Sequence, residues 1–169
     1  MKTKMIMLFL VLGSGGAFAQ HDHAKKSDAK MDQSMAMFKD AKLGAAYEHY
    51  IHLKDALVAS NRGEANKAAG ELEKSLRDVS GSAKAAEVTS KIMNASSLED
   101  QRKSFSLLSN EMATLVKGGK LSMGMLYLEY CPMANNNAGA FWLSNQKEIK
   151  NPYFGDKMLK CGSVKETIQ

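Results

Sequence analysis

Two short sulfur-containing motifs near the carboxyl end of the chain are the residues best suited to chemistry. Cys131 and Met133 are two positions apart, and Met158 and Cys161 are three positions apart. Residues i and i+2 share a face in an extended segment, and residues i and i+3 share one on a helical turn. Thiolate and thioether groups are soft donors, which select Cu(I) and the chemically similar Ag(I) over hard ions. If the turn expected at residues 151–155 folds the second motif onto the first, the four sulfur atoms meet in one metal site.

A disulfide between Cys131 and Cys161 is the alternative use of these residues. They are the two cysteines of the chain, and a bridge closing a loop of about thirty residues stabilises a fold by roughly 3–4 kcal/mol. Spacing alone favours this disulfide over the metal site. The two states are compatible, because a reducible disulfide can control access to a thiolate site. Zinc is a less suitable metal, since it prefers thiolate, imidazole and carboxylate to thioether.

Histidines offer two weaker candidate metal sites. His21 and His23 lie in a polar leader, and His23 could complete a square-planar Cu(II) or Ni(II) site only after cleavage behind Gln20. His49 and His52 are i,i+3 neighbours, but His52 points away from the apolar side of its predicted helix. We interpret the first pair as part of a solvated tail and the second as a solvated helix face.

Residues 1–19 have the features of a secretory signal peptide. Lys2 and Lys4 precede an unbroken apolar run over residues 5–12, and Ala17-Phe18-Ala19 is a small-x-small cleavage site. The apolar run is far shorter than the ~20 residues of a membrane-spanning helix. We therefore expect cleavage, export to the periplasm or beyond, and no membrane span in the mature protein. Export would place both cysteines in an oxidising compartment.

The rest of the chain is short enough for a single domain. We expect a flexible polar leader over residues 20–34 and one helical domain over residues 35–169. Within that domain, residues 35–119 form the helical part and residues 120–169 form the segment with the Cys and Met motifs. Removing the signal lowers the formal net charge from +5 to +3, and no basic run exceeds two residues. This charge pattern argues against a nucleic-acid partner.

Hydrophobic periodicity predicts a mainly α fold, an antiparallel up-and-down bundle of about four helices with an irregular or short-strand wrap at the carboxyl end. Asn61 with Glu64, and Ser97 with Asp100, have the spacing of helix starts. Lys54 falls inside the first apolar stripe, so we expect its stem along the core and its ammonium group in water. The methionines on the helices, such as Met93 and Met112, are interpreted as core residues. The helices are expected from about Met35 to Ser60, from Asn61 to Gly81, from Ser82 through Ile92, and from Ser97 to Gly118-Gly119.

The carboxy-terminal segment differs from the helical part in residue composition. Residues 125–130 are rich in strand-forming side chains, and residues 135–139 read as a loop. Phe141-Trp142-Leu143 is apolar, so we expect it to pack on the bundle. Trp142 would then shield a metal site from water.

Four motifs of this segment have a recognisable pattern: Tyr130-Cys131-Pro132-Met133, Gly139-Ala140-Phe141-Trp142-Leu143-Ser144, Ile149-Lys150-Asn151-Pro152-Tyr153-Phe154-Gly155 and Lys157-Met158-Leu159-Lys160-Cys161-Gly162. They resemble the motifs of a bacterial family of small exported proteins of unknown function. The same module resembles the carboxy-terminal extension of some periplasmic adaptor subunits of heavy-metal efflux pumps. The resemblance covers about residues 43–169 and implies a context of copper, silver or related metal efflux. That context favours the metal site over a disulfide alone.

We therefore expect a periplasmic binding protein for Cu(I)-type metals, with a component of a metal-efflux system as its partner. The alternative is a disulfide-stapled helical module of the cell envelope that docks a partner and holds no metal. An enzyme is not expected, because the chain has no phosphate-binding loop, no C-x-x-C and no H-E-x-x-H motif.

Overall fold

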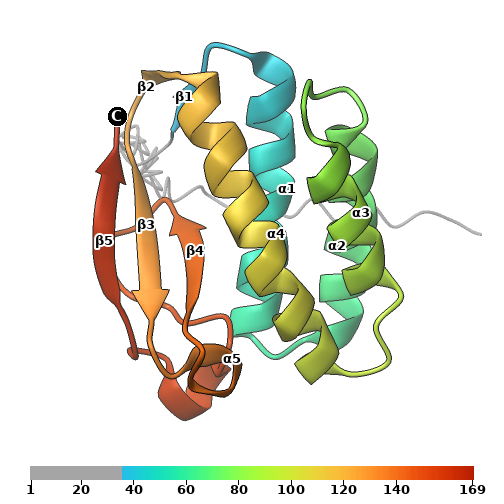
Figure 1. Ribbon diagram of the computed structural model, residues 1–169, viewed down its shortest axis with the longest axis vertical. Coiled ribbons are helices and arrows are strands. Elements are labelled where there is room, and N and C mark those ends of the chain that lie inside the picture. The colour runs from blue at the N-terminus through green and yellow to red at the C-terminus, as the bar shows by residue number, and fades with distance from the viewer. Residues whose placement is uncertain (1–35) are drawn as a thin grey trace, which may run out of the picture. The chain divides into compact units, whose positions relative to one another are not determined.

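The computed structural model describes residues 36–169. The signal peptide expected over residues 1–19 and the polar leader expected over residues 20–34, with His21 and His23, lie outside the described residues. In order, the elements are β1 (Met37–Phe38), α1 (Ala41–Val58), α2 (Arg62–Leu76), α3 (Ala83–Met93), α4 (Leu98–Gly119), β2 (Leu121–Met123), β3 (Leu126–Cys131), α5 (Ala134–Asn137), β4 (Ala140–Ser144), the 3-10 turn η1 (Gly155–Met158) and β5 (Ser163–Ile168). The fold is mainly α with antiparallel strands towards the carboxyl end, as the sequence predicts (Figure 1).

Polar side chains fix where the helices begin. The side chain of Asn61 accepts a hydrogen bond from the backbone N–H of Glu64 at 3.1 Å, and Ser97 accepts one from Asp100 at 3.0 Å. Both predicted helix starts are confirmed. The first helix begins later than predicted, because the Asp40 side chain caps it by accepting from the N–H of Lys42 at 2.8 Å. The residues before this cap form strand β1 instead.

Successive helices pack against one another, and α4 also contacts α1. A series of aromatic rings runs through the core and links these two helices to the carboxy-terminal segment. Ring centroids are 5.3 Å apart between Tyr50 and Phe105, and 5.9 Å apart both between Phe105 and Tyr153 and between Tyr153 and Trp142. Such spacing suits offset and edge-to-face contacts. Met112 is fully buried, which confirms its interpretation as a core residue.

The carboxy-terminal segment is more regular than the predicted irregular wrap. Strand β3 lies in the centre of a three-stranded antiparallel sheet, with β4 and β5 on either side. In Figure 1, β4 is the strand nearest to α4, and the two elements are in contact. Strands β1 and β2 form a separate antiparallel pair. Trp142 on β4 is fully buried, so the expected packing of this apolar run is confirmed.

The Lys54 side chain is more deeply buried than its position in the apolar stripe predicted. Its side chain is buried to the ammonium group, which lies 2.9 Å from a carboxylate oxygen of Asp55. The expectation that the ammonium group reaches water was wrong. The sheet covers this part of α1 and brings the carboxyl of Glu129 into electrostatic range of Lys54. Burying an ammonium group costs free energy, which the neighbouring carboxyl groups offset.

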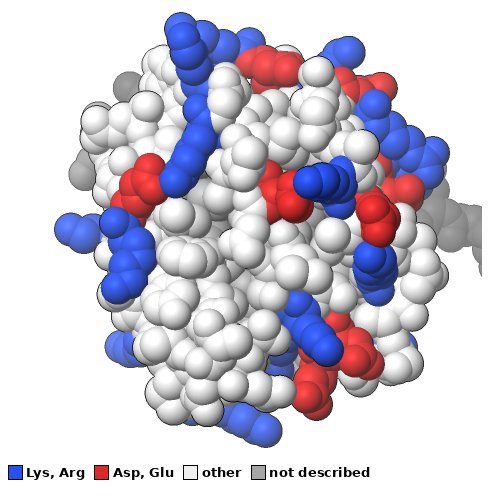
Figure 2. Space-filling model, in the orientation of Figure 1, with Lys and Arg blue, Asp and Glu red and all other residues white. Residues whose placement is uncertain are grey.

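The outer surface carries both signs of charge. Figure 2 shows Lys and Arg side chains interspersed with Asp and Glu, whereas the area over β4 and α5 is largely free of charged side chains. Within residues 36–169, no helix is both long enough and apolar enough to cross a membrane.

Candidate functional site

The two cysteines lie side by side in the folded chain. Cys131 is the last residue of β3 and is fully buried, while Cys161 follows the η1 turn and is partly exposed. Both are free thiols, and the Cys131 side chain is within hydrogen-bonding reach of Cys161. The hydrogen bond with Cys131, burial and the neighbouring Cys131 charge together raise the pKa of Cys161 to about 11. At neutral pH a metal ion must therefore displace a proton from this thiol.

The buried side chain of Asn151 holds the second cysteine in place. Its Nδ2 donates to the carbonyl oxygen of Cys161 at 2.7 Å, and its own backbone N–H donates to Leu159 at 2.8 Å. The Asn151 carboxamide oxygen also accepts from the N–H of Tyr153 at 2.8 Å. The N–H of Gly155 donates to Asn151 at 3.1 Å, which confirms the predicted turn. One side chain thus closes the loop that returns Cys161 to β3.

Gly162 allows the returning segment to approach the sheet closely. Its φ is +144°, and a Cβ there would lie 2.8 Å from Cη2 of Trp142 and 3.1 Å from the carbonyl oxygen of Tyr130. Only glycine fits such a close approach without a shift of backbone or ring. The Trp142 ring therefore lies directly beside the residue that follows Cys161.

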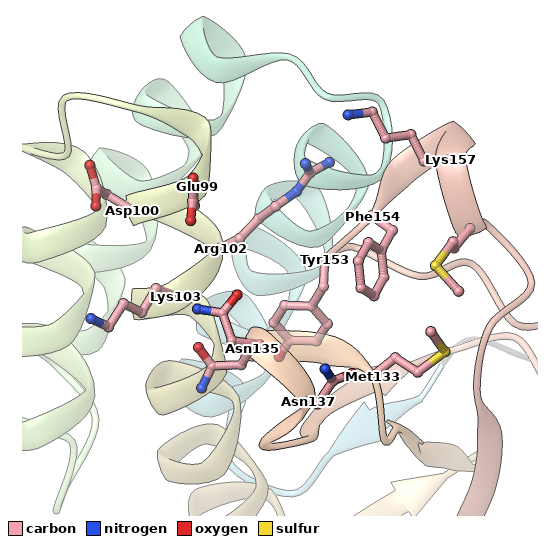
Figure 3. A pocket seen from close by; sticks show the side chains of 12 residues that line it. Glu99, Asp100, Arg102, Lys103, Met133, Asn135, Asn137, Tyr153, Phe154 and Lys157 are labelled. Carbon is pink, nitrogen blue, oxygen red and sulfur yellow. The ribbon is translucent and has the colours of Figure 1, made fainter.

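The two methionines line one cavity of about 640 Å³. Met133 follows β3 and is 46% exposed, and Met158 ends the η1 turn and is partly buried. Figure 3 shows Met133 and Phe154 on one side of this cavity and Asp100 on the other. The cavity is lined by Glu99, Asp100, Arg102, Lys103, Met133, Asn135, Asn136, Asn137, Tyr153, Phe154, Lys157 and Met158.

The fold therefore brings together the predicted ligands as two pairs. The thiols contact each other, and the thioethers of Met133 and Met158 share a cavity whose lining includes neither cysteine. Short backbone connections join the pairs: Pro132 separates Cys131 from Met133, and the N–H of Cys161 donates to the carbonyl of Met158 at 3.0 Å. A soft donor set of two thiols and two thioethers suits Cu(I) or Ag(I).

The connection that presents Met133 has an uncommon backbone. Asn135, Asn136 and Asn137 have φ values of +53°, +56° and +64°, all in the left-handed region. Asparagine tolerates this region better than other side-chain-bearing residues, although usually as single residues. Sequence reasoning predicted a loop here, whereas the structure contains one short left-handed turn, α5. Strained backbone of this kind concentrates at functional sites.

Arg102 positions the cavity wall and was not identified as a site residue from the sequence. Its Nε donates to the carbonyl of Pro152 at 2.8 Å, while its Nη2 donates to the carbonyl of Leu57 and to Oγ of Ser60, both at 3.0 Å. Partial burial lowers the pKa of Arg102. The sequence could have indicated this role, because Arg102 is a charged residue between Leu98 and Phe105 on the apolar stripe of α4.

Glu129 is a second residue that sequence reasoning missed. It is fully buried on β3, and among the described residues neither carboxylate oxygen has a hydrogen-bond partner. The indole N–H of Trp142 lies nearby without the geometry of a full hydrogen bond. Burial raises the pKa of Glu129 to about 7, against the opposing effects of Lys54 and Trp142. Period-two alternation places Glu129 on the same face of β3 as Cys131.

His49 and His52 each lie beside a carboxylate of α2. His52 Nε2 lies 2.9 Å from a carboxylate oxygen of Glu64, and His49 Nδ1 lies 3.7 Å from one of Glu71. Among residues 36–169, no cluster of three or more His, Cys, Asp or Glu side chains has the arrangement of a metal site. The Cys131, Cys161 and Met133, Met158 pairs are a different kind of group, because two of their four sulfur atoms are thioethers.

Comparison with known proteins supports a family resemblance over the helical part. Residues 46–124 match the model of a family described as Protein of unknown function (DUF3347). The match runs from within α1 to the end of β2 and stops before Cys131. No curated protein matches the chain. No solved structure matches it either.

Proposed function

We propose that this protein binds a soft monovalent metal, Cu(I) or Ag(I), through the thiolates of Cys131 and Cys161. The observation that carries the proposal is the contact between these two thiols, which lie far apart in the chain. Two adjacent thiolates are strong soft donors, and the neighbouring Trp142 ring provides an apolar environment that limits contact with water.

Met133 and Met158 are proposed as the thioether ligands of the same metal centre. They line the same cavity, and each is within three residues of one of the two cysteines along the chain. A thioether binds Cu(I) without losing a proton, whereas each thiol must lose one. We therefore propose that the methionines add affinity and the cysteines dominate it.

The proposed setting is the periplasm, reached through the signal peptide at residues 1–19, with a component of a metal-efflux system as the partner. We further propose that α1 to α4 form an up-and-down antiparallel bundle that supports the metal-binding segment. The role is binding rather than catalysis.

The test is a competition titration of Cu(I) against a chromophoric Cu(I) chelator, under anaerobic and reducing conditions. Wild-type protein is expected to bind one Cu(I) at its highest-affinity site, and the Cys131→Ser, Cys161→Ser double variant is expected to lose this affinity by at least about a hundredfold. Met133→Leu with Met158→Leu should weaken binding by about tenfold. Met112→Leu, a buried methionine away from the site, is the matched control. Equal affinity in the double cysteine variant and the wild type would overturn the proposal.

A disulfide-stapled interaction module remains the second candidate, because the same contact between thiols would allow a Cys131–Cys161 bridge. The area over β4 and α5, largely without charged side chains, would then be the docking surface (Figure 2). Thiol titration without reductant separates the two functions. Absence of free thiols, together with no metal uptake after reduction, would favour this second candidate.

A further inference from the structure

Methionine is unusually frequent on the described surface. Among the described residues, the exposed large hydrophobic side chains are Met37 (55% exposed), Leu107 (54%), Met123 (60%) and Met133 (46%). Three of these four are methionine, although leucine is the commoner residue in the core. The buried positions are thus mainly occupied by branched side chains, whereas flexible thioether side chains are exposed on the surface.

Two of these exposed methionines face each other across a strand pair. Met37 on β1 is the direct partner of Met123 on β2 in an antiparallel register. Side chains directly opposite in such a pair extend from the same face, with Cβ atoms about 4.5–5.5 Å apart. Each methionine has three rotatable side-chain bonds, so both sulfur atoms can reach a single ion between them.

The strand pair is anchored, so the two methionines are held opposite each other. Phe38 is buried and its ring centroid is 5.3 Å from that of Tyr47. The register shifts between Met37 and Phe38, which lets Phe38 enter the core while Met37 stays exposed. Outside the ladder, Lys39 N–H donates to the carbonyl of Lys120 at 3.2 Å, and Ser122 Oγ donates to that of Met37 at 3.2 Å. Figure 1 shows β1 and β2 side by side.

The surroundings argue for a small ligand rather than a protein partner. Among residues 36–169, the neighbours of the pair include the exposed polar side chains of Lys39, Lys120 and Ser122, which interrupt the apolar surface around the two methionines. Two thioethers offer no oxygen donor, which excludes hard cations such as Mg²⁺ and Ca²⁺. The lysines disfavour cations bound by charge alone. Soft metals bonded through sulfur are the class that remains.

We propose that Met37 and Met123 form a second, thioether-only site for Cu(I) or Ag(I), separate from the cysteine site. Thioethers have no proton to lose and do not form disulfides. This site therefore binds at mildly acidic pH and after oxidation of the cysteines, two conditions that disable a thiolate site. This site goes beyond the proposed function, because its binding of metal does not depend on Cys131 and Cys161.

The experiment uses the full mature chain carrying Cys131→Ser and Cys161→Ser, labelled with ¹³C at the methionine methyl groups. Silver nitrate is titrated in chloride-free buffer at pH 5, where ordinary imidazoles are mostly protonated, and again at pH 7. The Met37 and Met123 methyl signals are expected to shift together and saturate at one equivalent. Affinity should differ between the two pH values by less than about threefold.

Adding Met37→Leu and Met123→Leu should lower this affinity by at least about tenfold. Met125→Leu is the matched control, since the Met125 sulfur already accepts a hydrogen bond from the Tyr127 hydroxyl at 3.1 Å. Circular dichroism and the remaining methyl signals establish that each variant is folded. Unchanged affinity in the Met37, Met123 variant would overturn the second site. Equal shifts of the methyl signals of every exposed methionine would also overturn the second site. The same holds if the Met37 and Met123 methyl signals shift on self-association of the protein in the absence of silver.

Discussion

Nε of Arg102 on α4 donates a hydrogen bond to the carbonyl oxygen of Pro152 at 2.8 Å, and this bond fastens the loop before Cys161 to the helices. The same guanidinium group also reaches the last turn of α1 through Leu57 and Ser60. One side chain therefore connects α1, α4 and the loop that precedes Cys161. Lysine cannot replace it, because a single ammonium group lacks the planar set of donors.

Arg102→Lys is expected to lower the free energy of unfolding by about 1–3 kcal/mol, because buried carbonyls lose their donors. Urea denaturation followed by circular dichroism measures the change. Arg77→Lys is the control: Arg77 forms an exposed pair with Glu73 on α2, where a change within about 0.5 kcal/mol is expected. Equal losses in the two variants would contradict the role of Arg102 as a fastening residue.

Glu129→Gln should remove a pH dependence of stability. Because the pKa of Glu129 rises from 4.5 to about 7 on folding, the folded state keeps a proton that the unfolded state releases. This contribution to stability is fully present below about pH 4.5 and is lost as pH rises through 7. The variant should therefore lose less stability than the wild type over this range, by at most about 3 kcal/mol.

The measurement for Glu129 is a series of urea titrations between pH 4.5 and 7.5. Glu148→Gln, at an exposed position, is the control and should follow the wild-type pH profile. If Glu129→Gln also follows that profile, the carboxyl of Glu129 is ionised in the fold across the whole range and the expected linkage is wrong.

Local signals in the sequence predicted local structure well. The caps at Asn61 and Ser97 depend on side chains within three residues of the hydrogen bonds that they make, so sequence spacing sufficed to find them. The turn at residues 151–155 was also predicted from neighbouring residues. The approach of Cys161 to Cys131 was expected if this turn folds the second motif onto the first, and the two side chains are in contact.

Pairings between distant segments were beyond sequence reasoning. The pairing of Met37 with Met123 in the strand register depends on how the whole helical part returns β2 to β1. The burial of Lys54 and Glu129 depends on where the sheet meets α1, which no periodicity in either segment specifies. The separation of the four predicted ligands into a thiol pair and a thioether cavity likewise follows from tertiary packing.

Cys131→Ala is expected to make the remaining thiol more reactive. Contact with Cys131 is the largest cause of the raised pKa of Cys161, so its removal moves that pKa from about 11 towards the ordinary 9. More of the nucleophilic thiolate then exists at pH 8, and alkylation by iodoacetamide should accelerate by about tenfold. Mass spectrometry of timed samples measures the rate, with Met133→Ala as the control for local loosening. A rate equal to that of Cys161 in the wild type would show that the neighbouring thiol does not set its pKa.

Gly162→Ala should disrupt the approach of the returning segment to β3. The added Cβ would lie 2.8 Å from the buried Trp142 ring and 3.1 Å from the carbonyl oxygen of Tyr130, at a φ of +144° that alanine rarely adopts. We expect a loss of about 1–3 kcal/mol in stability and a weaker Cu(I) affinity, because Cys161 moves away from Cys131.

Gly118→Ala is the control for Gly162→Ala. It lies within α4 with no atom within 4 Å of its new Cβ, so a gain of about 0.5–1 kcal/mol is expected. Urea denaturation and the Cu(I) competition titration measure both variants. If Gly162→Ala keeps wild-type stability and affinity, the close approach at Gly162 is not what holds the two cysteines together.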